Sequence, residues 1–195
     1  MNIINTNIKS DLKRTKVGLI PADWSYVEVG NVFTFLRGSS FSRSKLNYDY
    51  QEESIFNIHY GDIHSTYTKP ILNCKDSDKI PVLNSDISIS SNIDCLMDGD
   101  VLIADASEDY EGVGKAIELE NIAGRKIIAG LHTFALRDHS GLTVEGFRAY
   151  IFKNPNISLA LKKIATGSKV YGISKSNLDK FKIVLPTLPE QQKIV

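Results

Sequence analysis

Short apolar runs that end at turn residues fill the middle of this chain, and they constrain its fold more than any other feature. Residues 54–60 run into Gly61, and residues 100–105 follow Gly99. Runs of this length, rich in strand-forming residues and bounded by glycine, predict β-strands. Similar runs recur at residues 115–119, 126–130 and 132–136. The middle of the chain is therefore predicted to be rich in β-structure.

The spacing of apolar residues becomes helical after Val144. Apolar side chains recur at intervals of three and four residues, first at Phe147, Tyr150 and Ile151, and then at Ile157, Leu161 and Ile164. This spacing predicts two helices near the C-terminal third, separated at Pro155. Residues 181–185 return to a strand pattern. Two helices after a β-rich middle favour an α+β domain over a regular βαβ repeat.

The first part of the chain divides near residue 17. Residues 1–16 are polar and cationic, and we expect a leader or loose arm there. Beyond them the pattern predicts a turn at Pro21, a strand that starts at the core residue Trp24, and a short helix through Phe35. The folded domain is predicted to span residues 17–186.

A further helix is predicted to begin at residue 187. Thr187 and Glu190 match a capping box, in which each side chain hydrogen-bonds the backbone of the other, and Pro189 suits the first helical turn. The sequence stops at Val195, which leaves room for little more than that turn. We therefore expect residues 187–195 to be the start of a longer helix that has been truncated.

The net charge is zero, but the charges are segregated along the chain. Residues 1–45 carry 7 basic and 3 acidic side chains, residues 46–120 carry 4 and 16, and residues 121–195 carry 12 and 4. The overall balance argues against a histone-like nucleic-acid binder and against a polybasic membrane surface. A positive face is still possible if the fold brings the two basic ends together.

Cysteine usage and hydropathy indicate a cytoplasmic protein. Cys74 and Cys95 lack the spacing of a zinc site, and two cysteines in a chain of this length suggest reduced thiols. The N-terminus develops no apolar stretch of signal-peptide length, and no run approaches the ~18 apolar residues of a membrane span. We expect neither secretion nor membrane insertion.

Signatures of common enzymes are incomplete. Residues 112–115 lack the first glycine and the final Ser or Thr of a phosphate-binding loop, and residues 94–105 lack two ligand positions of a calcium loop. The four histidines have no metal-like spacing. We expect no catalytic centre and no metal or cofactor bound by this chain. A metal held by the carboxylates around Asp105 stays open as an alternative.

Two loops combine cationic and hydroxyl side chains within the basic end segments. The first spans residues 37–45 and the second residues 167–175. Such groups dominate contacts to phosphates and also reach base edges. Their occurrence in both basic ends favours nucleic acid over other ligands, although ordinary solvated turns have the same composition.

Eight short segments occur in a characteristic order. They lie at residues 20–24, 37–39, 60–63, 99–103, 114–115, 165–168, 173–174 and 185–192. This ordered series resembles one target-recognition domain of the specificity subunit of Type I restriction-modification enzymes. The resemblance covers residue 17 to the end, and its most specific piece is the closing Leu-Pro-Thr-Leu-Pro-Glu-Gln-Gln.

The resemblance implies a non-catalytic, cytoplasmic protein that recognises duplex DNA. A domain of this kind binds one half of a bipartite target, and residues 187–195 would begin the conserved spacer helix that follows it. Its partners would be methyltransferase (modification) subunits, through them the restriction subunit, and a second recognition domain. S-adenosylmethionine, ATP and Mg would belong to those partner subunits.

The resemblance also implies which residues face the DNA. They lie in the first loop, in the segment after the strand at 54–60, and in the late loop. The candidates are Arg37, Ser39, Ser40, Ser42, Arg43, Lys45, Tyr60, Asp62, His64, Lys169, Tyr171, Ser174 and Lys175.

Two departures from the family pattern leave alternatives open. Ser39 and Ser40 stand where a Thr-Pro pair is common, and residues 105–111 are acidic where the family often has glycine. Those carboxylates could accept a hydrogen bond from a cytosine amino group or form a solvated turn. The alternative functions are the recognition domain of a fused restriction-methylation enzyme and a protein-binding module with a basic face.

Overall fold

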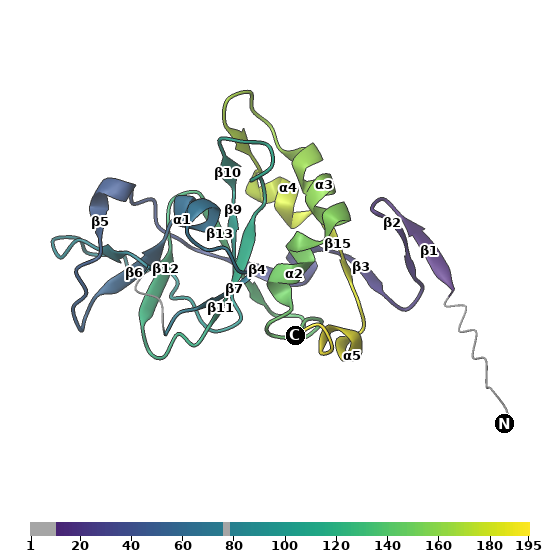
Figure 1. Ribbon diagram of the computed structural model, residues 1–195, viewed down its shortest axis with the longest axis horizontal. Helices are drawn as coiled ribbons and strands as arrows, with labels where there is room; N and C mark the ends of the chain where they lie inside the picture. Colours follow the sequence, from purple (N-terminus) through teal and green to yellow (C-terminus); the bar gives the residue numbers. More distant parts are fainter. Residues whose placement is uncertain (1–10, 76–78) are drawn as a thin grey trace.

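The computed structural model describes residues 11–75 and 79–195 as a mixed α and β fold (Figure 1). Its largest sheet has five strands, in the order β4 (Phe33–Leu36), β13 (Thr133–Asp138), β9 (Val101–Ala104), β11 (Ala116–Glu120) and β7 (Ile71–Asn73). The β11–β7 pair is parallel and the other neighbours are antiparallel.

Four further strands form a second sheet, in the order β12 (Lys126–Ala129), β6 (Ile55–Ile58), β8 (Val82–Leu83) and β5 (Leu46–Asn47). Three antiparallel pairs complete the strands: β1 (Leu12–Thr15) with β2 (Gly18–Pro21), β3 (Ser25–Glu28) with β15 (Lys182–Leu185), and β10 (Ala106–Ser107) with β14 (Tyr171–Gly172). The α-helices are α1 (Tyr60–Ser65), α2 (Arg148–Lys153), α3 (Pro155–Ile164), α4 (Lys175–Asp179) and α5 (Leu188–Gln191).

The five-stranded sheet is buried on both faces, and strand β9 shows why. Val101 and Ile103 pack into one hydrophobic cluster with residues of α2, α3, α4 and β15. Leu102 and Ala104 pack into a second cluster with residues of α1, β6 and β12. Because side chains alternate along a strand, a fully apolar strand serves two cores. The α+β prediction is confirmed.

Two charged groups inside the fold fix elements to this sheet. Glu118 of β11 is buried and accepts hydrogen bonds from the backbone N–H groups of Gly146 and Ala149, at 2.6 and 3.2 Å, which holds the start of α2. Burial raises the pKa of Glu118, while these bonds oppose the rise. Asp100, which directly precedes β9, pairs with Arg137 of β13 at 2.7 Å.

Several predicted elements are present. The strands expected at 54–60, 100–105 and 181–185 are β6, β9 and β15, and the two helices separated at Pro155 are α2 and α3. The capping box at Thr187 and Glu190 forms, and Trp24 packs against the first cluster and donates its Nε1–H to Glu190 Oε2 at 3.0 Å. No helix in the described ranges has the length and apolarity needed to cross a bilayer.

Three local predictions were wrong. The short helix through Phe35 is a three-residue 3-10 turn, Val29–Asn31, followed by β4, because pairing with β13 satisfies the backbone of residues 33–36. The expected arm at 1–16 includes β1, which pairs with β2, so residue 16 lies inside a hairpin. Residues 1–10 of that expected arm lie outside the described residues. The strand expected at 54–60 ends at Ile58, and Tyr60 begins helix α1, which His59 and Asp62 cap.

Candidate nucleic-acid interface

The three segments predicted to face DNA are connected in the structure. Arg43 of the first loop pairs with Asp62 of α1 at 2.8 Å. His64 of α1 hydrogen-bonds the backbone oxygen of Ala106 at 2.9 Å, and β10, which contains Ala106, pairs with β14 of the late loop. We call residues 37–45, α1, residues 105–111 and residues 166–175 the loop surface. In Figure 1, α1 and β10 lie on the upper side of the molecule.

The first loop contains both anchored and unpaired side chains. Ser39 Oγ donates to Ala129 O at 3.0 Å and accepts from Asn57 Nδ2 at 2.9 Å, and Ser42 Oγ contacts Ser44 Oγ. The exposed side chains of Arg37, Ser40 and Lys45 have no hydrogen-bond or ion-pair partner in the part of the chain that the structure describes. These three are the groups of this loop that remain available to a ligand.

The carboxylate of Asp62 has a structural role, because its contacts are all within the fold. It is buried, accepts from the backbone N–H of His59 at 3.3 Å, and binds the half-exposed guanidinium of Arg43. Arg43 also donates to the hydroxyl of Tyr48 at 2.7 Å. Burial raises the pKa of the Asp62 carboxyl, and Arg43 opposes that rise. Asp62 therefore holds Arg43 and α1 in position.

A cluster of aromatic and imidazole rings joins α1 to His59 and His132, which we add to the loop surface. The ring of Tyr60 lies 4.5 Å from that of His59, 5.3 Å from that of His132 and 6.0 Å from that of His64, measured between centroids. His132 Nδ1 lies 3.1 Å from Asp105 Oδ1. Burial raises the pKa of Asp105, and the nearby His132 opposes the rise.

Sequence reasoning missed His132. It belongs to the three-residue connection between β12 and β13, and no motif or spacing marks it. Its backbone adopts a left-handed conformation with φ of 54°. The sequence pattern placed it at the start of the strand predicted at 132–136, whereas β13 begins at Thr133.

The late loop folds as a tight hairpin. Thr166 and Gly172 exchange backbone hydrogen bonds, and Gly167 has a φ of 125° that a Cβ would not tolerate, since it would lie 1.9 Å from Val170 O. Lys169 is exposed at the tip, and the ring of Tyr171 meets that of Tyr110, 5.4 Å away.

The end of the late loop leads into α4. Ser174 caps this helix by accepting from the N–H of Asn177 at 3.2 Å. Lys175, its first residue, places Nζ 5.1 Å from the centroid of the Phe35 ring on β4. The late loop therefore also touches the strand that leads into the first loop.

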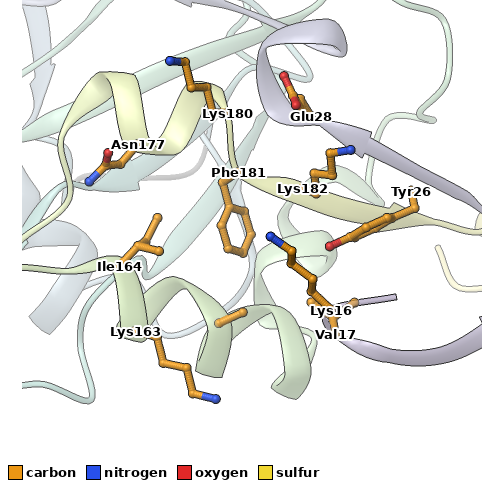
Figure 2. A pocket seen from close by; sticks show the side chains of 11 residues that line it. Lys16, Val17, Tyr26, Glu28, Lys163, Ile164, Asn177, Lys180, Phe181 and Lys182 are labelled. Atoms are coloured by element: carbon orange, nitrogen blue, oxygen red, sulfur yellow. The ribbon is translucent and has the colours of Figure 1, made fainter. Parts of the chain in front are cut away.

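The two basic ends of the chain also meet at residues outside the loop surface. Lysines from both ends line a groove of about 690 Å³: Lys16, Lys163, Lys180 and Lys182. We call it the lysine groove. Figure 2 shows Phe181 at its centre, between Ile164 of α3 and the side chains of Lys16 and Tyr26. Glu28 is the one carboxylate among its described lining residues.

Metal-binding side chains do not gather in the described part of the chain. Residues 11–75 and 79–195 contain no group of three His, Cys, Asp or Glu arranged to hold an ion, including around Asp105. Cys74 is buried, Cys95 is exposed, and both thiols are free.

Comparison with known proteins gives consistent matches. The family model described as Type I restriction modification DNA specificity domain matches residues 21–195. The HsdS subunit from Thermoanaerobacter tengcongensis aligns with a TM-score of 0.53 and 23% identity over 90% of this chain and 36% of that one. The S subunit of the Type-I restriction-modification system from M. genitalium aligns with a TM-score of 0.50 and 13% identity over 88% of this chain and 37% of that one. The chain thus spans little more than a third of these subunits.

Proposed function

Because this chain belongs to the family of Type I restriction modification DNA specificity domains, we propose that it recognises one half of a bipartite duplex DNA target. It does so for a Type I restriction-modification complex and catalyses no step itself. The observation that supports this function is the connected loop surface, which combines unpaired cationic side chains with a fixed cluster of hydrogen-bonding rings.

The loop surface contains some side chains suited to binding phosphates and others suited to binding bases. The exposed ammonium groups of Lys45 and Lys169 suit phosphate oxygens, whereas the unpaired guanidinium of Arg37 can form two parallel hydrogen bonds with a guanine edge. Arg37 and Lys45 lie in the first loop, and Lys169 lies at the tip of the late loop. Groups on two loops can contact one duplex together, at its phosphates and in its major groove.

Chemistry on the DNA is assigned to partners in this proposal. Methyltransferase subunits bind S-adenosylmethionine, a restriction subunit uses ATP and Mg, and a second recognition domain supplies the other half of the target. The limited share of the compared S subunits that this chain covers agrees with one recognition unit within a larger, cytoplasmic assembly.

Selection from a random duplex library tests the proposed function. The unmodified protein should enrich one short sequence, and combined replacement of Arg37, Arg43 and Lys169 by alanine should abolish binding to it. Replacing the exposed lysines Lys69, Lys75 and Lys126 removes the same charge outside the loop surface and should leave the preference unchanged. Undiminished affinity of the first triple variant would refute the site.

The lysine groove favours a second candidate function, a protein-binding module for an acidic partner. Its four lysines surround an apolar floor that contains Phe181 and Ile164, so it suits a segment with both carboxylates and apolar side chains. A salt titration separates the two functions. DNA binding through 6–10 phosphates must weaken by about 10³–10⁵ between 50 and 200 mM salt. No DNA binding at 50 mM salt would favour the protein partner.

A further inference from the structure

We propose that His132 is a specificity-determining residue that recognises one base pair by accepting a hydrogen bond from the exocyclic amino group of adenine or cytosine. The inference rests on the proposed function, and it concerns a residue that neither the charge pattern nor the family resemblance indicates. Three features of the structure support it: the backbone of His132, its pairing with Asp105, and its neighbours.

The backbone of His132 is held in an unfavourable conformation. Its φ of 54° lies in the left-handed region, which costs most L-residues about 1 kcal/mol or more. Glycine would adopt this conformation without that cost. The side chain is nevertheless 49% exposed, so core packing does not explain why a histidine stands here. A strained residue with an exposed functional group suggests a role at a binding surface.

Asp105 determines which ring nitrogen of His132 carries the proton. The Asp105 carboxylate accepts hydrogen bonds and donates none when ionised, so His132 Nδ1, 3.1 Å away, must be the N–H nitrogen. In neutral imidazole the other nitrogen, Nε2, is then an acceptor. Nε2 has no partner among the described residues, and it is the one acceptor of the ring left for a ligand.

The surroundings of His132 restrict its ring. Tyr60 packs edge-on against it with the ring planes 80° apart, and Tyr60 in turn touches His59 and His64. Asp105, Tyr60 and His59 are the titratable groups that face it. In the major groove, only adenine N6 and cytosine N4 offer hydrogen-bond donors. A fixed acceptor at this point therefore selects adenine or cytosine on one strand.

Sequence selection with two variants tests the inference. The unmodified protein should enrich adenine or cytosine at one position by about 5- to 150-fold. His132→Asn, which tolerates the left-handed backbone, should keep the other positions and lose preference at that one. Asp105→Asn allows either nitrogen of His132 to carry the proton, because an amide both donates and accepts, so guanine should become acceptable at the same position.

A matched control lies at the other end of β13. His139 is exposed, contacts Thr34 Oγ1 at 3.1 Å, and stands roughly 20 Å from His132 along the strand. His139→Asn should leave the whole selected sequence unchanged. An identical preference from the protein and from His132→Asn would overturn the inference while leaving the proposed function standing. If the unmodified protein enriches no sequence, the proposed function itself fails.

Discussion

The loop surface and the lysine groove differ in how their polar side chains are held. In the loop surface most of them have partners within the fold, as in the pairs of Arg43 with Asp62 and of His132 with Asp105. In the lysine groove the ammonium groups have no hydrogen-bonding or ion-pairing partner in the described ranges, apart from Lys182 above the Tyr26 ring. Groups held by partners can discriminate between ligands by geometry, whereas unpaired lysines attract any anion. We therefore expect the loop surface to contribute the selectivity and the lysine groove to contribute only non-specific attraction.

The largest expected effect comes from breaking the support of the loop surface. Asp62→Ala removes the cap of α1 and the partner of Arg43, and we expect a loss of about 2–3 kcal/mol in the free energy of unfolding. Thermal unfolding measures it, as a decrease of roughly 5–10 °C in Tm. Asp86→Ala, at an exposed carboxylate, is the matched control and should leave Tm unchanged. Equal Tm values for both variants would mean that Asp62 does not organise this surface.

The importance of Asp62 also shows what the sequence could and could not reveal. Periodicity predicted β6, β9, β15, α2 and α3 because each of these elements buries apolar side chains at regular spacing. Helix α1 was missed because it is six residues long and buries mainly Ile63, so its clearest signal was the His59 and Asp62 cap.

The candidate site was predictable only in part, for a related reason. Its loops could be found from composition, but His132 and Asp105 are 27 residues apart and meet only because β9 and β13 are neighbours. The charge pattern correctly raised the possibility that the basic ends come together. They meet in the lysine groove, and they also meet where Lys175 lies over the Phe35 ring, beside the acidic residues 105–111 that pair with the late loop.

A smaller effect is expected from removing charge in the lysine groove. Glutamine at all four lysines should lower DNA affinity about tenfold, equally for the selected duplex and a scrambled one. The slope of log affinity against log salt should fall by about one for each lysine that contacts a phosphate. The control carries glutamine at four exposed lysines elsewhere: Lys69, Lys75, Lys126 and Lys153. An unchanged slope in the groove variant would exclude the groove from DNA binding and support the protein-binding candidate.

The smallest expected effect separates two neighbouring serines. Ser39 Oγ joins the first loop to Ala129 and to the buried amide of Asn57, whose Oδ1 already lacks a partner among the described residues. Ser39→Ala leaves that amide without any hydrogen bond, and we expect a loss of about 1 kcal/mol in unfolding free energy. Ser40 is exposed and its hydroxyl has no hydrogen-bond partner among the described residues, so Ser40→Ala should leave denaturant unfolding unchanged. If the two variants unfold at the same denaturant concentration, the Ser39 hydroxyl does not anchor the first loop. The first loop would then not contain the hydrogen-bonded side chains that distinguish the loop surface from the lysine groove.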